Sequence, residues 1–513
     1  MGLFYEVLFL LVLGVIGIVL YLKHLYTYWE KKGVYVFSKP HIIFGNAKPL
    51  LTGKGAIRDL FKKVYDDCRR NSQKMSGFYF MMKPCLVLAD LDLIKDIMST
   101  DFEHFTDRIF HNHESDPLSD QIASAKGEKW KQLRTQLTPA FSIAKSKMMS
   151  QKVLAYTDKL IEELTHNYRD KKTIEISEVV GKYVARLTEA AIFGMENDKI
   201  HGVTTEFEHY LKSFFHKSSL DLLITLLTFF NPSMLTYVRA RSVRKDVSDY
   251  FLKLSGDIIK FREENNIVRD DLIHLLIQLR NNVDINETSG QILQESKIKP
   301  LLSSSQIAAN CLIIAIADYE TVASAVSFCL YELALKPDLQ ERARREVVDV
   351  LALHNGDFCY DVVNELNYVE QCLKESLRKY SPSAAHSREC TKPYIIPNTD
   401  ILLEPGTHVF VPTSGSHMDP NIFPDPERFD PERFSKENCA GRHPCAWTPF
   451  GFGPRMCIGM KYGMMKSKIC VAKLLLNFEF STNHLTEIPI TVKPKAFITK
   501  SANGIRLDIR KID

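Results

Sequence analysis

The ten residues FGFGPRMCIG at positions 450–459 constrain the fold of this chain more than any other stretch, because they bend the backbone around one cysteine, Cys457. Gly451 and Gly453 allow backbone conformations and close approaches that a side chain would block. Pro454 fixes its own backbone angle and stiffens the loop. Such a loop can lie against a flat group, so the fold has to present it to a partner.

The segment after this loop, IGMKYGMMKSKICVAKLLLNF, has the composition of a helix, which places the Cys457 sulfur near a helix N-terminus. Backbone N–H groups and the helix dipole favour a thiolate there. Such a thiolate is a metal ligand or a nucleophile, although a cysteine taken alone is more often part of the core. The eleven cysteines lack regular spacing, which is typical of reduced thiols in a long chain.

At every fixed position the loop resembles the haem-binding sequence F-G-x-G-x-R-x-C-x-G of the cytochromes P-450. The resemblance extends over the whole chain, and phrases such as GEKWKQLRTQLTPAF and FPDPERFDPERF are similar to microsomal members from insects. It implies that Cys457 is the thiolate ligand of the iron of haem b, a ligand that favours O–O cleavage. It also implies that Phe450 and Arg455 contact the haem, Arg455 through a propionate.

A second family pattern is E-x-x-R, which the phrase ESLRKYSP supplies as Glu375 and Arg378 on one face of a predicted helix. Taken alone, the pair reads as a solvated salt bridge. The resemblance implies a buried network that supports the cysteine loop and is completed by the arginine of a later P-E-R-F. Two copies of P-E-R-F make Arg428 and Arg433 rivals, and the spacing to the cysteine loop favours Arg433.

Two further stretches resemble haem-propionate ligands of the family. In WKQLR, Trp130 and Arg134 lie one helical turn apart, so an indole N–H and a guanidinium can reach the same anionic group. Without the other patterns, a packed tryptophan beside a surface arginine is the simpler reading. Arg388 in YSPSAAHSREC matches another propionate ligand, although Ser381 stands where the family has its first proline.

The oxygen-activating pattern of the family, A/G-G-x-D/E-T, is altered in the predicted buried helix at residues 307–328. The chain has Ala317, Asp318, Tyr319, Glu320 and Thr321, so an aspartate replaces the glycine. The resemblance implies that Thr321 and Glu320 organise proton delivery through water. Asp318 has four open readings: it binds a polar substrate, redirects protons, narrows the site and slows the reaction, or turns toward solvent.

The N-terminus predicts a membrane anchor. Residues 3–22, LFYEVLFLLVLGVIGIVLYL, are apolar over about the length that crosses a bilayer. Lys23, Lys31 and Lys32 follow this span and no lysine or arginine precedes it, so the positive-inside rule places the rest on the cytosolic side. We expect an anchor at 1–22, a membrane-proximal linker at 23–50 and one haem-containing catalytic domain at 51–513, in the endoplasmic reticulum membrane.

Hydrophobic periodicity predicts a mostly α fold with a small β region, the α+β architecture of the cytochromes P-450. Helices are expected at 142–165, 271–280 and 304–336, and strands at 77–90 and 394–412. A net charge of +4 among 66 basic and 62 acidic residues gives no indication of nucleic-acid binding. The single glycine cluster fails the dinucleotide pattern G-x-G-x-x-G at Met456, so the family's NADPH–cytochrome P-450 reductase is the expected electron donor.

The resemblance implies a monomeric monooxygenase that inserts one atom of O2 into a lipophilic small molecule, either a xenobiotic or an endogenous hormone or lipid. Asp318 keeps two alternatives open: a haem-thiolate isomerase or dehydratase that uses no O2, and a protein that binds haem and ligand without turnover. The regions expected to select the substrate are residues 105–125 and 214–235. Their sequences do not indicate which substrate binds. By resemblance the second region overlies the substrate entrance, although its apolar composition also suits core helices.

Overall fold

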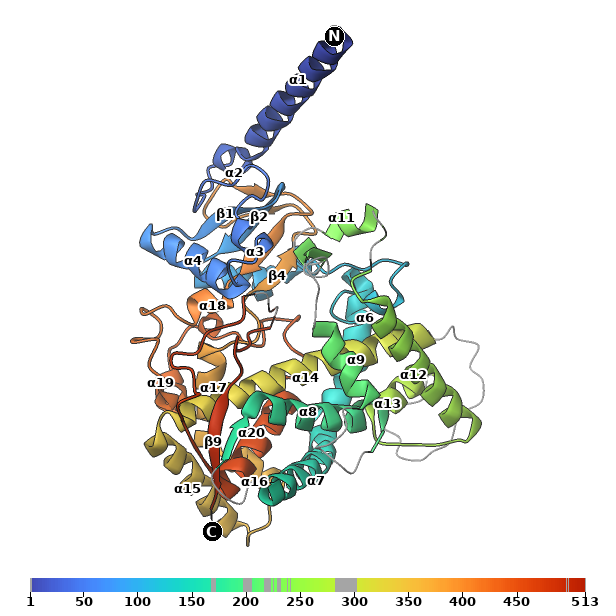
Figure 1. Ribbon diagram of the computed structural model, residues 1–513, viewed down its shortest axis with the longest axis vertical. Coiled ribbons are helices and arrows are strands. Elements are labelled where there is room, and N and C mark those ends of the chain that lie inside the picture. The colour runs from blue at the N-terminus through green and yellow to red at the C-terminus, as the bar shows by residue number, and fades with distance from the viewer. Residues whose placement is uncertain are drawn as a thin grey trace.

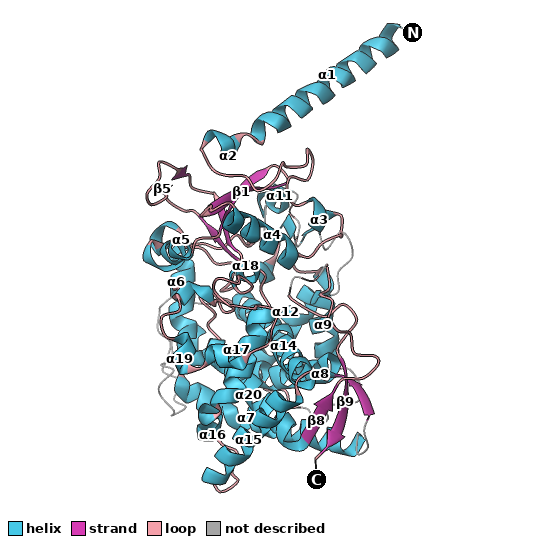
Figure 2. Cartoon of the chain, turned by 90° about the vertical axis from the view of Figure 1, so that its left-hand side faces the viewer, coloured by secondary structure: helices cyan, strands magenta, loops and turns pink. Residues whose placement is uncertain are grey.

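The computed structural model gives a mostly helical molecule in which two small sheets flank a helical body (Figure 1, Figure 2). It describes residues 2–167, 172–196, 205–215, 223–224, 226–227, 232–237, 239, 241–281, 302–494, 496 and 498–512. Most of the apolar stretch at 214–235 therefore lies outside the described residues.

Helix α1, Gly2–Leu25, projects from the body of the molecule as the sequence predicts (Figure 1). It has a mean hydropathy of 2.7 and no buried residue. A helix satisfies its own backbone hydrogen bonds, which is the requirement for a chain segment surrounded by lipid. The exposed apolar surface of α1 thus has the length and composition of a membrane span.

The segment after α1 is attached to the body through Trp29, which is fully buried. Its ring lies against Gly77 so closely that a Cβ at Gly77 would collide with it. The Trp29 N–H of the backbone donates to the Tyr79 hydroxyl at 3.1 Å. The end of the anchor is therefore held against the first strand of the larger sheet.

Four strands form the larger sheet in the order β1-β2-β7-β4, in which only the pair β2 and β7 is parallel. A second sheet has the order β3-β9-β8, and β5 pairs with β6. The predicted strands at 77–90 and 394–412 are confirmed. The strands are β1 (Met75–Phe80), β2 (Lys83–Leu88), β3 (Lys172–Glu175), β4 (His386–Glu389), β5 (Tyr394–Ile395), β6 (Leu402–Leu403), β7 (His408–Val411), β8 (Phe478–Ser481) and β9 (Arg506–Lys511).

The helices that follow α1 include the three predicted ones, which are confirmed as α7, α13 and α14. They are α2 (Tyr28–Lys31), α3 (Lys48–Leu51), α4 (Ile57–Arg70), α5 (Leu91–Lys95), α6 (Gly127–Leu137), α7 (Ile143–Asn167), α8 (Ile176–Phe193), α9 (Glu206–Phe215), α11 (Pro232–Tyr237), α12 (Lys245–Glu264), α13 (Leu272–Arg280), α14 (Ser304–Ala334), α15 (Pro337–Leu353), α16 (Tyr360–Glu365), α17 (Asn367–Lys379), α18 (Thr413–Ser416), α19 (Lys436–Cys439) and α20 (Met460–Asn477).

Helix α14 is the centre of the main hydrophobic core (Figure 1). Ser303 and Gln306 form a capping box that fixes its start. Its apolar residues are buried against α8, α12, α17 and α20. The helix is apolar and long enough to span a membrane, but two thirds of its apolar window is buried inside the protein, so it is a core helix.

Candidate active site

The cysteine loop has the backbone geometry that its glycines predict. Gly451 and Gly453 have φ values of +78° and +71°, which disfavour any side chain. A Cβ at Gly453 would also collide with the carbonyl oxygen of Met98. The Cys457 N–H closes the loop by donating to the Phe450 carbonyl at 2.8 Å, and α20 begins three residues after Cys457.

The Cys457 side chain is exposed, yet burial raises the pKa of its thiol. The amide of Gly459 and the charges of Arg108 and Arg134 lower that pKa, whereas Asp318 raises it. From a thiol that is accessible and desolvated at the same time we infer a space inside the protein beside it, called the cavity below. Burial thus outweighs the Gly459 amide and the two guanidiniums in the direction of this pKa shift.

Buried positive charge surrounds this cavity. Arg388 donates to the Ser387 carbonyl, and its Nε has no hydrogen-bond partner among the described residues. Burial and the charges of Arg108 and Arg455 lower the pKa of Arg388 well below its usual range. Burial and the charges of Arg108 and Arg134 lower the pKa of Arg455 to about 9, although Asp107 raises it. Buried guanidiniums that repel one another are stabilised when an anion binds between them. We therefore expect an anionic ligand at this site.

Trp130 and Arg134 lie on α6, one turn apart as predicted, and each contacts the cysteine loop. The Trp130 ring lies 4.0 Å from the guanidinium of Arg455, measured to the ring centroid. Arg134 Nη1 donates to the Met456 carbonyl at 2.9 Å. Arg455 itself donates to three backbone carbonyls, and its only described carboxylate neighbour is Asp107 at 3.7 Å. The cluster thus remains strongly positive.

Beneath the loop, Glu375 and Arg378 form a completely buried ion pair. Arg378 donates twice to the carboxylate, with Nε at 2.7 Å and Nη2 at 2.8 Å. Arg433 Nε lies 3.4 Å from the same carboxylate, whereas the Arg428 side chain is exposed. The geometry therefore selects Arg433 over Arg428 as the third member of the network.

His417 connects this network to the cysteine loop. Its Nε2 accepts from the Thr448 amide at 2.9 Å, so its Nδ1 carries the hydrogen that faces the Arg378 carbonyl. The Thr448 carbonyl accepts from His386 Nε2 and from the amide of Gly451. Burial lowers the pKa of His417 to about 3 and that of His386 to about 4, so both rings are neutral near pH 7.

Helix α14 presents the predicted oxygen-activating residues. Ala317 is exposed in the middle of an otherwise buried helix, so it also faces an internal space. Thr321 Oγ1 donates to the Ala317 carbonyl at 2.5 Å, one turn earlier. Glu320 is 7% exposed and accepts from Lys500 Nζ at 2.8 Å. Lys500 is 43% exposed, so the Glu320 carboxylate lies one residue away from solvent.

Asp318 points to two other helices. Its carboxylate accepts from Lys466 of α20, whose side chain is fully buried, and from Thr188 Oγ1 of α8 at 2.7 Å. The Asp318 side chain is 13% exposed. Among the four readings of Asp318, an orientation toward solvent is therefore wrong, because the carboxylate is engaged inside the protein.

A family model for cytochrome P450 matches residues 37–506. The chain belongs to the cytochrome P450 family. Curated relatives include cytochrome P450 6a2 of Drosophila melanogaster, 31% identical over 99% of this chain and 100% of the relative. Probable cytochrome P450 6a13 of the same species is 34% identical over 97% of this chain and 98% of the relative. Cytochrome P450 6k1 of Blattella germanica is 32% identical over 99% of this chain and 97% of the relative.

The cofactor of a P450 is haem, and the residues around the cavity fit it. Haem brings an iron that takes a cysteine thiolate and two carboxylates that take guanidiniums. Cys457 offers an accessible sulfur, and Arg388 offers an unpartnered N–H group. A bound haem would explain both observations, because its iron would take the sulfur and its carboxylates would take the guanidinium.

Sequence reasoning missed four residues of this site: Arg108, His417, Lys466 and Lys500. Arg108 donates to the Arg455 carbonyl at 2.5 Å, and its pKa is lowered to about 10 by burial. None of the four belongs to a motif used above, and each partner lies far away in the sequence. Only the unusual Asp318 gave a signal, since a buried acid requires a donor.

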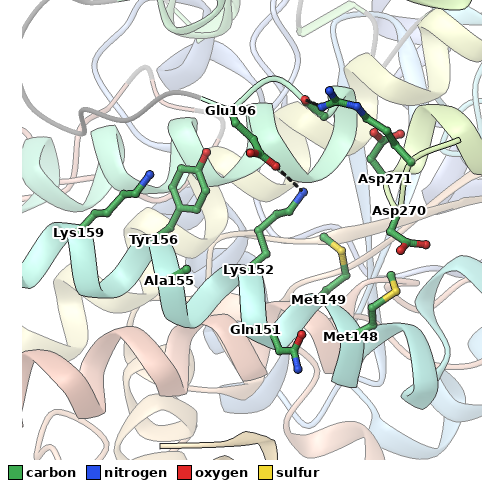
Figure 3. A pocket seen from close by; sticks show the side chains of 12 residues that line it. Met148, Met149, Gln151, Lys152, Ala155, Tyr156, Lys159, Glu196, Asp270 and Asp271 are labelled. Atoms are coloured by element: carbon green, nitrogen blue, oxygen red, sulfur yellow. Dashed lines mark hydrogen bonds and ion pairs between the residues drawn. The ribbon is translucent and has the colours of Figure 1, made fainter. Parts of the chain in front are cut away.

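A second hollow of about 580 Å3 lies at the surface along α7 (Figure 3). Its wall includes Met148, Lys152, Asp270 and Asp271, and Lys152 lies 3.9 Å from Glu196. Charged side chains of both signs line it, and it contains none of the predicted site residues. This hollow is separate from the haem site.

Proposed function

We propose that this P450 oxidises a lipophilic small molecule at the cytosolic face of the endoplasmic reticulum, with electrons from NADPH supplied by a separate NADPH–cytochrome P-450 reductase. One observation carries the proposal: the Cys457 thiol is accessible yet desolvated, and the buried Arg388 guanidinium, repelled by Arg108 and Arg455, has no carboxylate partner among the described residues. The candidate substrates are xenobiotics and endogenous hormones or lipids.

The haem-holding residues have separate tasks. Cys457 would ligate the iron, while Trp130, Arg134, Arg388, Arg455 and the newly found Arg108 would hold the propionates. Phe450 packs in the loop and accepts from the Cys457 amide, which fixes the direction of the sulfur. When bound, haem supplies the reduction of O2 that inserts one oxygen atom into substrate and releases the other as water.

Thr321 and Glu320 deliver protons to the reacting oxygen. Thr321 lies one turn after Ala317 on the same face of α14, and the bond from its hydroxyl to the Ala317 carbonyl fixes its orientation. Glu320 lies next to it and reaches the surface through Lys500. A buried carboxylate with one exposed partner can pass a proton from solvent through water.

Membrane attachment suits a lipophilic substrate. The exposed apolar helix α1 places the catalytic domain at the bilayer, where such molecules concentrate. Lys23, Lys31 and Lys32 flank the span on the domain side, which supports a cytosolic orientation. The proposed enzyme acts as a monomer, and its net charge of +4 gives no indication of a nucleic-acid partner.

The alternatives without O2 chemistry or turnover rest on Asp318 alone. Lys466 and Thr188 occupy its carboxylate, which removes the reason to expect altered oxygen chemistry. Both alternatives remain outcomes of the test below.

The test begins with a screen for ligands that shift the haem absorption spectrum of the purified full chain. Ligands that bind are then incubated with NADPH and reductase, and product and NADPH consumption are measured. We expect a hydroxylated product from at least one ligand, and Thr321→Val should lower product per NADPH by about ten-fold. Binding without any O2-dependent product would contradict the monooxygenase proposal and favour one of the two alternatives.

A further inference from the structure

The unusual acid at position 318 has a dedicated partner. Lys466 lies on α20, nine residues after Cys457, and both oxygens of Asp318 accept from its Nζ. The Lys466 side chain is fully buried, and a Lys ammonium is rarely found so deep without a carboxylate partner. The pair therefore links the helix that follows the cysteine ligand to the helix that carries Thr321.

Two more contacts fix the direction of this pair. Thr188 of α8 donates to Asp318 Oδ2 at 2.7 Å, so the carboxylate is held from a second helix. Lys466 Nζ lies 4.8 Å from the centroid of the Tyr462 ring, which stabilises the ammonium from its other side. Asp318 thus has charged or polar partners on α8 and α20, whereas its neighbour Ala317 faces the cavity.

An unengaged carboxylate at position 318 would be harmful to the proposed chemistry. It would follow Ala317 directly on α14 and precede Thr321 by less than one turn. A second acid beside Thr321 and Glu320 would offer protons at the wrong place or raise the cost of negative charge on bound oxygen. The chain avoids this outcome only if something holds Asp318 elsewhere.

We infer that Lys466, assisted by Thr188, is a positioning residue that holds the Asp318 carboxylate away from the oxygen-binding side of α14. Asp318 is then not a catalytic acid in this P450, and proton delivery runs through Thr321 and Glu320. This inference rests on the proposed function, and it identifies Lys466 as the residue that makes an aspartate compatible with the altered A-D-x-E-T sequence.

The test uses four forms of the haem-loaded full chain: wild type, Lys466→Met, Asp318→Gly/Lys466→Met and Lys468→Met. Methionine keeps the length of lysine without its charge. Lys468 is the matched control, because it lies on the same helix, is nearly buried and pairs with Glu370 at 2.9 Å. If losing a buried lysine only disturbed the packing of α20, Lys466→Met and Lys468→Met would show the same defect.

The first readout is the C–O stretching frequency of the ferrous carbonyl complex, which reports charge beside the bound ligand without turnover. Negative charge near the ligand oxygen weakens back-donation and raises this frequency. We expect a raised frequency in Lys466→Met and a return to the wild-type value in the double variant. Lys468→Met should match wild type.

The second readout is hydroxylated product per NADPH, with released hydrogen peroxide. Lys466→Met should lower this ratio by about ten-fold, and the double variant should restore it to within about two-fold of wild type. If Lys466→Met yields no folded protein, the double variant must recover folding, the wild-type frequency and the product ratio together.

A wild-type frequency in Lys466→Met, or a double variant that stays defective, would overturn the inference. Failure of the proposed function looks different: no form would make product, while the frequency pattern would still distinguish Lys466→Met from the rest.

Discussion

Two sets of ion pairs involve buried carboxylates near the candidate haem site, and they differ in how completely those carboxylates are satisfied. Under the cysteine loop, the Glu375 carboxylate accepts twice from Arg378 and once from the Asp430 amide, with Arg433 nearby. Arg378 also donates to the carbonyls of His417 and Pro426.

On α14 the Asp318 carboxylate also accepts three hydrogen bonds, from Lys466 and Thr188, whereas the Glu320 carboxylate accepts only from Lys500 among the described residues. A saturated network stabilises one conformation of the chain, whereas a sparse pair leaves a carboxylate able to change partners. We therefore expect damage under the loop to affect folding and haem loading, and damage on α14 to affect chemistry.

The largest effect is expected from Arg378→Met. It leaves the Glu375 carboxylate buried without its main donor, which costs about 3–5 kcal/mol of folding free energy. Denaturant unfolding of the haem-loaded protein measures this loss. Arg428→Met is the control, because the exposed arginine of the other P-E-R-F copy should change stability by less than about 0.5 kcal/mol. Equal losses of unfolding free energy in Arg378→Met and Arg428→Met would contradict the structural role of the network under the cysteine loop.

Arg388→Met should separate haem binding from folding. Removing its buried guanidinium, whose Nε has no hydrogen-bond partner among the described residues, relieves repulsion with Arg108 and Arg455, so the protein without haem should be at least as stable as wild type. Haem affinity should fall by about 10- to 100-fold, because a charge-assisted hydrogen bond is lost. Haem transfer to apomyoglobin measures the affinity. Unchanged affinity would remove Arg388 from the propionate ligands.

Acid should weaken the loop network through its neutral histidines. The pKa of His386 in the folded protein is about 4, below the usual value of 6.5. Between these two pH values the unfolded state therefore binds more protons than the folded state. Stability is full above pH 6.5 and falls by about 1.4 kcal/mol per pH unit as the pH drops toward 4. His386→Gln keeps a donor for the Thr448 carbonyl and should reduce the measured slope by that amount. An identical slope in both proteins would contradict this assignment.

Lys500→Gln is expected to have the smallest effect on folding. Its ammonium is 43% exposed, so the pair with Glu320 contributes less than about 1 kcal/mol to stability. If Glu320 delivers protons through this pair, the product ratio should still change measurably, by up to about five-fold. A stability loss as large as that of Arg378→Met would erase the distinction between the two regions.

Sequence reasoning located the loop network because its residues stand in short, fixed patterns. Glu375 and Arg378 share a helix face at a spacing of three, and the glycines around Cys457 have the backbone angles expected of them. The strands, the central helix and the apolar anchor helix were also readable, because each depends on a local apolar period.

The partners of the α14 acids were not readable, because no local rule joins residues 148 or 180 positions apart. Asp318 alone left four readings open, and only the packing of α20 and α8 on α14 excluded one of them. Arg108 was missed for the same reason: it lies in an irregular loop, and its neighbours come from the end of the chain.

The central claim is that Cys457 supplies a thiolate to haem iron, and the ferrous carbonyl spectrum tests it most directly. Folded, haem-loaded wild-type protein should show the red-shifted Soret band of thiolate ligation, and Cys457→Ser should lose that band while its helical content is retained. Wild-type protein that binds haem without this band, or Cys457→Ser protein that keeps it, would contradict the account.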